Sequence, residues 1–323
     1  MRRAILLTFA LVLLLPLAPS LAFAHGFGQT YDLPLPLWLY LFGAGAAVLV
    51  SFVPISVFAG EREAGKDTLY QYRRFDLLQI GFLRAVLTGR MLLLGLRLLS
   101  VGLFSLVVLS GLFGQQNSDT NFAPTFVWII WWVGLSFFTT FVGNVWPLVN
   151  PWRVLFEWSE ALVHRLGIRE SLELDEPYPA SWGVWPAVLL YTIFVWVENV
   201  FWGSSLPVNI AVLTLSYSVL TWGGMLIYGK YAWLRWGEVF SVFFSLLARF
   251  APTEVRVRDP KLCRDCSDAC GTFEKECVNC YECFAEAAPE DRELNLRPPA
   301  VGLASPEPVP PGGVFFVILV LAG

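Results

Sequence analysis

The sequence predicts an all-α fold: a polytopic bundle of transmembrane helices with interfacial amphipathic helices and a small Cys-rich module. Three observations predict it. Hydrophobic residues make up 56% of the 323 residues and charged residues only 15%, whereas about a quarter of a soluble domain is charged. The 14 Trp and 26 Phe suit the aromatic belts of a membrane protein. All six cysteines lie in one polar segment, 251–300.

Residues 1–24 have the three parts of a secretory signal peptide. A start with two arginines is followed by an apolar stretch and by the small-residue cleavage site Ala22-Phe23-Ala24. Cleavage after Ala24 would make His25 the first residue of the mature chain. The alternative is an uncleaved signal anchor.

Five apolar segments follow, each long enough to cross a hydrocarbon core about 30 Å thick. The predicted transmembrane helices of the membrane domain (25–250) are 35–59, 91–113, 122–149, 182–203 and 208–229. Arg97 and Glu198 are the charged residues within these five segments.

The loops between the segments predict the orientation. Loop 60–90 holds six Lys and Arg residues and loop 150–181 holds three, whereas 114–121 and 203–207 hold none. Basic loops stay in the cytoplasm, so the first two loops are predicted to be cytoplasmic and the last two to lie outside. An exported mature N-terminus gives the same orientation. The module at 251–300 is then cytoplasmic.

Two amphipathic segments are expected to lie in the membrane interface. Segment 231–250 has only about ten apolar residues uninterrupted by charge, too few to cross a bilayer. Segment 150–168 looks like its counterpart after the third predicted span. At the end of the chain, 301–323, a Pro- and Gly-rich linker leads into an apolar run. We interpret that run as the start of a further transmembrane helix in a truncated chain, the alternative being a tail in the interface.

The six cysteines have the spacing C-x2-C-x3-C-x6-C-x2-C-x2-C. They are Cys263, Cys266, Cys270, Cys277, Cys280 and Cys283. The cytoplasm keeps thiols reduced, which disfavours a disulfide framework, and gaps of two residues let neighbouring thiolates converge on one metal. The pattern predicts a metal site; the alternative is a disulfide or redox-switch segment.

The run CVNCYEC (277–283) resembles the C-x2-C-x2-C run of bacterial ferredoxins, which bind [4Fe–4S] clusters. The resemblance implies one cluster with four ligands: Cys270, Cys277, Cys280 and Cys283. It covers 263–289 and leaves Cys263 and Cys266 as a pair. Ala287 stands where the family has its next cysteine, so the motif is degenerate.

Zinc is the competing metal. Two C-x2-C pairs can build a closed tetrahedral site of four thiolates, for instance Cys263 and Cys266 with Cys280 and Cys283. Such a site can fold a domain too small to have a core of its own. The residues leave a [4Fe–4S] cluster and zinc open.

Four other polar residues are candidates. His25 at a mature N-terminus could bind copper through its amine and imidazole, or it is an ordinary residue after a cleavage site. Arg97 either snorkels to the headgroups or bonds Asn144, which lies at a similar depth. Glu198 is a candidate proton or cation site, unless its place near the outer interface simply solvates it.

Several stretches together resemble uncharacterised bacterial inner-membrane proteins: the HGFG…YDLPLPLWLY start, the NPW turn and the WGEVFS…LLARFAP stretch. The resemblance implies a multi-pass protein of the bacterial inner membrane. Its partners are then the lipid bilayer and other membrane or redox subunits. A net charge of −4 with no basic stripe excludes nucleic acid as a partner.

The function predicted from these features is a part in membrane electron transfer or metal handling. A catalytic triad, a paired-carboxylate motif and a phosphate loop are all missing from the sequence, so we do not expect an enzyme in this chain on its own. The alternative is a transporter-like or scaffold protein with a structural zinc module.

Overall fold

The structure is a computed structural model. It describes residues 42, 72–169, 171–174, 176–258, 262, 272–273, 276–304 and 309–322. The predicted signal peptide 1–24, His25, and the first predicted span apart from Phe42 lie outside these residues. So do Cys263, Cys266 and Cys270. The elements below all belong to one compact unit, Ser51–Gly323.

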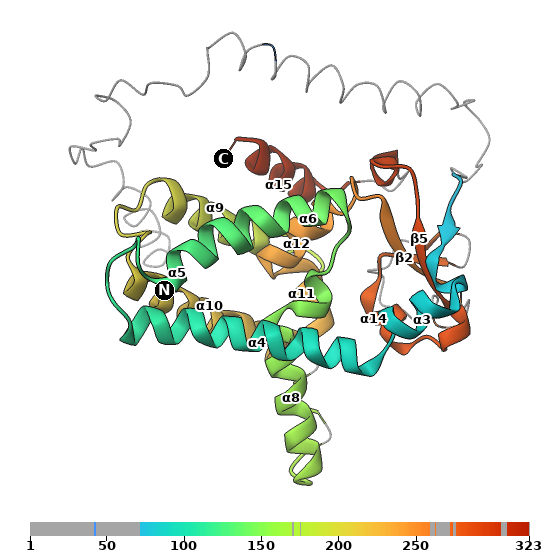
Figure 1. The fold of residues 1–323 in the computed structure, drawn as a ribbon, viewed down its shortest axis with the longest axis horizontal. Coiled ribbons are helices and arrows are strands. Elements are labelled where there is room, and N and C mark those ends of the chain that lie inside the picture. The colour runs from blue at the N-terminus through green and yellow to red at the C-terminus, as the bar shows by residue number, and fades with distance from the viewer. Residues whose placement is uncertain are drawn as a thin grey trace. The chain divides into compact units, whose positions relative to one another are not determined.

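Three helices of the described part are long and apolar enough to cross a membrane: Gly81–Phe113, Phe122–Phe141 and Pro207–Tyr228 (Figure 1). The first consists of α3 (Gly81–Leu87) and α4 (Arg90–Phe113), and the third is α10. Pro207 opens α10 at a position where its missing N–H costs nothing. Gly229, with φ of 81°, ends it.

The second long helix is made of α5 (Phe122–Pro124), the π-helical η3 (Thr125–Gly134) and α6 (Leu135–Phe141). It ends at Phe141, not at residue 149 as predicted. The N–H groups of Val142 and Gly143 both donate to the carbonyl of Phe138, and Asn144 then accepts from the N–H of Trp146 at 3.1 Å. This break starts a separate turn, α7 (Trp146–Val149).

The fourth predicted span, 182–203, corresponds to a shorter helix. α9 (Trp185–Asn199) has 15 residues, which rise about 22 Å, less than the ~30 Å of a hydrocarbon core. The C-terminal apolar run forms α15 (Pro311–Ala322), which packs against α9 through the rings of Phe316 and Tyr191.

The segment 231–250, predicted to lie in the interface, forms two short helices: α11 (Lys230–Trp236) and α12 (Val239–Leu247). α12 is not a surface helix, because Val239, Phe240, Phe243 and Phe244 are all buried. The other predicted interfacial segment forms α8 (Pro151–Arg165), whose first residues are buried and whose last residues are exposed.

The core of the helical part is aromatic, and α12 lies within it. The rings of Trp131, Trp132 and Trp146 contact Phe240 of α12, the closest pair having centroids 4.6 Å apart. Trp152 of α8 stacks on the same ring. The apolar side of α12 is therefore covered by the surrounding helices.

The prediction of an all-α fold is wrong for one part of the chain. A five-stranded antiparallel sheet has the order β1-β5-β2-β4-β3. Its strands are β1 (Phe75–Asp76), β2 (Thr253–Val257), β3 (Thr272–Phe273), β4 (Glu276–Val278) and β5 (Arg292–Leu296). Short helical turns accompany them: η2 (Leu77–Gln79), α14 (Tyr281–Glu286), η4 (Pro289–Asp291) and η5 (Val301–Ala304).

The sheet joins two segments that are distant in sequence. β1, from loop 60–90, pairs with β5 in the register Phe75↔Leu296. The predicted module 251–300 therefore includes a strand from the first basic loop, and strands that pair cannot lie on opposite sides of a membrane.

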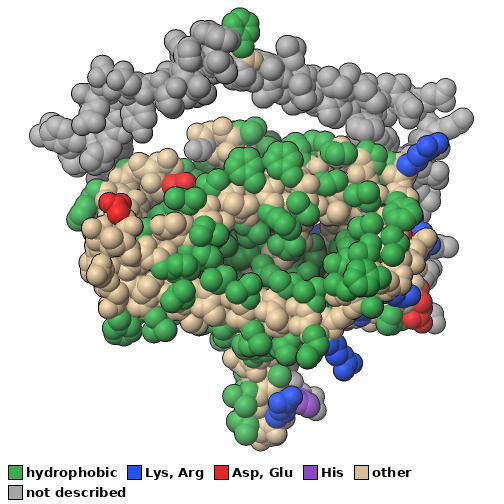
Figure 2. Space-filling model, viewed as in Figure 1, with side chains coloured by type: hydrophobic (Ala, Val, Ile, Leu, Met, Phe, Trp, Pro, Cys, Tyr) green, Lys and Arg blue, Asp and Glu red, His purple; other side chains and the backbone are tan. Residues whose placement is uncertain are grey.

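Each of the two loops without Lys or Arg is hydrogen-bonded to a residue of a long helix. Gln116 accepts a hydrogen bond from the N–H of Val208 at 3.0 Å, and Trp128 donates to the carbonyl of Ser204 at 3.0 Å. On the face drawn in Figure 2, Lys and Arg side chains gather near the sheet and on α8, and apolar side chains cover much of the rest.

Candidate functional site

The three described cysteines share one buried cluster. Cys277 lies in β4, Cys280 directly precedes α14 and Cys283 lies in α14. Their exposed fractions are 1%, 9% and 1%, and they pack with Val257 and Ala287.

Asn279 turns the chain between the first two cysteines. Its φ is 53°, a left-handed conformation that Asn adopts more readily than most residues. Its N–H donates to the carbonyl of Val255 at 2.8 Å, and its side chain accepts from the N–H of Val255 at 3.1 Å. The turn directs Cys277 and Cys280 into the same cluster.

The cysteines of this cluster can act chemically in two ways, as metal ligands or as disulfides. Cys280 and Cys283 are disulfide-bonded in the structure, and sulfurs in that state cannot ligate a metal, which needs thiolates. Within the described ranges, no group of three or more His, Cys, Asp or Glu is placed to hold a metal ion. Both predicted ligand sets also contain cysteines outside those ranges. When the cysteines are reduced, the cluster offers buried sulfur ligands. When they are oxidised, disulfides cross-link the chain at this place.

The sheet is hydrogen-bonded to the break after α6. The hydroxyl of Tyr281, next to Cys280, donates to the carbonyl of Asn144, and Thr253 donates to the carbonyl of Val142 at 2.6 Å. Burial raises the pKa of Tyr281, although the nearby Arg153 opposes the shift. The cysteine segment thus directly contacts the residues that follow a helix long and apolar enough to cross a membrane.

From Asn144 the contacts continue to a buried carboxylate, Glu238. Trp146 bonds Asn144 through its backbone and donates through its indole to Glu238 at 3.4 Å. Tyr217 donates to the other carboxylate oxygen, and the N–H groups of Phe240 and Ser241 donate at 3.0 and 2.7 Å. Both oxygens of this fully buried side chain act as acceptors, so Glu238 caps α12 and ties it to α7 and α10.

Glu238 is missing from the residues predicted as sites. The signal that could have found it is a carboxylate directly before an apolar run, which is an N-cap pattern.

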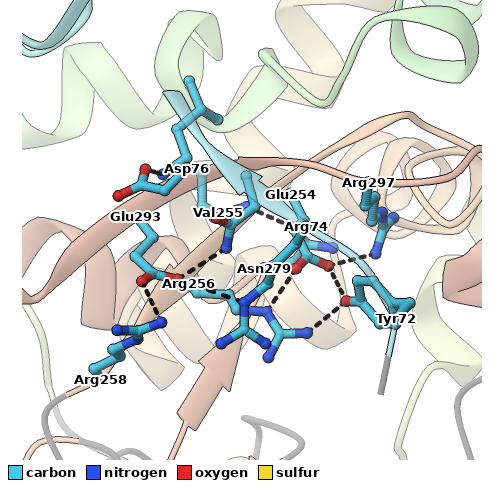
Figure 3. A network of polar contacts seen from close by, with 12 residues as sticks. Tyr72, Arg74, Asp76, Glu254, Val255, Arg256, Arg258, Asn279, Glu293 and Arg297 are labelled. Carbon is cyan, nitrogen blue, oxygen red and sulfur yellow. Dashed lines mark hydrogen bonds and ion pairs between the residues drawn. The ribbon is translucent and has the colours of Figure 1, made fainter. Parts of the chain in front are cut away.

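A second polar cluster lies on one face of the sheet (Figure 3). Glu254, with 0% of its side chain exposed, accepts from Arg256 at 2.6 Å and from Arg297 at 2.7 Å. Tyr72 donates to the same carboxylate at 2.5 Å. Burial raises the pKa of Tyr72, and Glu254 raises it further.

This cluster connects the sheet to α12. Arg297 also donates to the carbonyls of Ala248 and Ala251 at 2.9 and 3.1 Å, where a cation is favourable at the end of a helix. Along β2, Glu254 and Arg256 point to this face, while Val257 packs with the cysteines on the other. The sheet therefore has a charged face and a sulfur-bearing face.

The predicted intramembrane residues do not come together. Arg97 pairs with Glu157 of α8 at 3.1 Å, and in the described part it has no hydrogen bond with Asn144. Glu198, in the last turn of α9, accepts from the indole of Trp132 at 3.0 Å. Arg97 and Glu198 do not pair.

Comparisons of this chain with known protein families, with curated proteins and with solved structures find no match.

Proposed function

We propose that this chain is a membrane component whose cysteine segment binds a metal and serves electron transfer or metal handling. The observation that carries the proposal is the gathering of Cys277, Cys280 and Cys283 in one buried cluster. A turn at Asn279 brings the first two together, as convergent ligation requires. Reduced thiolates there, completed by cysteines from 263–270, would hold either a [4Fe–4S] cluster or zinc.

The position of the cluster supports a role linked to the membrane. Tyr281 bonds the chain at the end of α6, so a group held by the neighbouring cysteines would lie beside the helix ends. We further propose that the protein spans the bacterial inner membrane several times, with the cysteine segment in the cytoplasm. The pairing of β1 with β5 supports placing the basic loop 60–90 and the cysteine segment on the same side.

Metal analysis of protein purified anaerobically in detergent tests the proposal. We expect iron with sulfide and a visible absorption band for a cluster, or a colourless protein with zinc. Cys280→Ser and Cys283→Ser should each lose most of the metal. Tyr281→Phe, which keeps every cysteine, is the matched control and should retain it. Protein without metal, or unchanged metal in both cysteine variants, would contradict the proposal.

A second function is favoured by the disulfide-bonded state of Cys280 and Cys283. In this case the segment is a thiol–disulfide element, structural if it faces the oxidising side and a redox switch if it faces the cytoplasm. Alkylation of thiols before and after reduction, followed by mass spectrometry, separates the two functions. Metal-free protein in which reduction exposes further thiols, those of Cys280 and Cys283 among them, would favour this one.

A further inference from the structure

We propose that the exposed end of α8 lies in the headgroup region of the membrane and binds anionic phospholipid. The α8 tip is defined here as residues 161–169. Three large apolar side chains of the tip are exposed: Leu162 at 58%, Leu166 at 63% and Ile168 at 66%. This proposal does not depend on the cysteine segment.

The charge of the tip is basic. Residues 161–169 contain two arginines and a histidine and no acidic residue, although four acidic residues follow in the sequence: Glu170, Glu173, Asp175 and Glu176. Arg165 and Arg169 are exposed.

The acidic residues nearer the start of α8 form ion pairs with other basic side chains. Glu157 pairs with Arg97 and Arg153, at 3.1 and 2.7 Å. Glu160 pairs with Lys230 at 2.6 Å. The arginines of the tip therefore face solvent or headgroups without competition from these carboxylates.

The position of Lys230 indicates how deep the α8 tip lies relative to the membrane. α10 has 22 residues, which rise about 33 Å, close to the ~30 Å thickness of the hydrocarbon core. Lys230 follows the end of α10 at Gly229, so its partner Glu160 lies where α10 leaves the membrane. In Figure 1, α8 runs across the direction of α4 and α10 and projects from the helices, which carries the tip along the membrane surface.

The side chains of the α8 tip suit both the acyl chains and the headgroup of a phospholipid. Leu162, Leu166 and Ile168 would enter the boundary of the acyl chains, as the apolar face of an interfacial helix does. A guanidinium binds phosphate through paired hydrogen bonds, so Arg165 and Arg169 would hold the headgroups.

Native mass spectrometry of the full chain in detergent tests the charge requirement. The protein is titrated with short-chain phosphatidylglycerol and, separately, with phosphatidylcholine. Arg165→Gln should weaken phosphatidylglycerol binding about fivefold, the fold-change that corresponds to ~1 kcal/mol for one basic residue at an anionic surface. Arg165→Gln with Arg169→Gln should abolish the preference over phosphatidylcholine.

Arg73→Gln is the matched control, because Arg73 is an exposed arginine in the other basic loop; it should leave the preference unchanged. Unchanged phosphatidylglycerol binding in the double variant would overturn the proposal.

Photocrosslinking identifies the occupant directly. With Leu166→p-benzoylphenylalanine in phosphatidylglycerol-containing membranes, we expect adducts of phospholipid. A crosslink to another protein at this position would show a protein-docking surface and overturn the proposal.

Discussion

At the scale of single residues, Glu238 joins three helices through one carboxylate. Replacing it by Ala removes the cap of α12, worth about 1 kcal/mol. It also leaves the buried donors of Tyr217 and Trp146 without their acceptor, at about 1–3 kcal/mol each. We expect Glu238→Ala to lower the free energy of unfolding by roughly 3–7 kcal/mol, measured by denaturant unfolding in detergent.

Glu198→Gln is the control for this prediction. Glu198 accepts one hydrogen bond, from Trp132, among the contacts of the described part, and the amide oxygen of Gln can keep it. We expect a loss below about 1 kcal/mol. Equal losses in the two variants would show that Glu238 has no special structural role.

The buried pair of Arg297 and Glu254 makes a second prediction at this scale. Arg297→Met removes a guanidinium that is 2% exposed and bonds both Glu254 and the end of α12. Breaking a buried ion pair from one side costs roughly 3–5 kcal/mol. The control is Arg74→Met, since Arg74 lies 3.9 Å from Glu293 and is more exposed; its effect should stay below about 1 kcal/mol. Thermal unfolding of both variants in detergent checks the difference.

At the scale of elements, the contact of α4 with α10 depends on a glycine. A Cβ at Gly111 would lie 2.6 Å from both the Cβ of Ala211 and the carbonyl oxygen of Pro207. Gly111→Ala should therefore separate the helices and destabilise the protein by about 1–3 kcal/mol, the usual cost of overpacking.

Gly102, on the same helix, has nothing within 4 Å of an added Cβ. Gly102→Ala should stabilise by up to about 1 kcal/mol, because Ala is the better helix former. A lower unfolding temperature for Gly111→Ala together with a higher one for Gly102→Ala would support the contact. A stabilised Gly111→Ala variant would refute it.

The long helices were the easiest elements to predict, because their signal is local. α4 and α10 begin and end close to the predicted 91–113 and 208–229, since apolar composition alone determines where such a helix can cross. The break after Phe141 was missed because Asn144 was interpreted as one polar residue inside an apolar span, not as the start of a turn. Its cause is a hydrogen-bond pattern that composition does not encode.

The sheet and the burial of α12 could not be predicted for a related reason. β1 has two residues, too few for an alternating pattern, and its partner β5 is distant in sequence. The apolar face of α12 predicts burial but not whether lipid or protein covers it. Among the candidate site residues, the cysteine spacing was visible in the sequence, whereas Glu238 and Glu254 acquire their partners only through the fold.

At the scale of the whole molecule, the two ends of the helices differ in charge, and this predicts an orientation. Alkaline phosphatase, active only outside the cytoplasm, should be active when fused after Asn117. A fluorescent protein that folds in the cytoplasm should fluoresce when fused after Ser171. The reverse pattern would place the cysteine segment outside and favour disulfides.

The place of β5 in the sheet has a consequence for biosynthesis. β5 lies between β1 and β2 and pairs with both, yet it follows α4, α10 and α12 in the chain. While the ribosome is still synthesising the helices, β1 has no partner strand, because β5 has not yet been made. Long-range pairing of this kind is slow and leaves strands exposed. The sheet can therefore close only after β5 has left the ribosome, so the helices are made before the charged and sulfur-bearing faces exist.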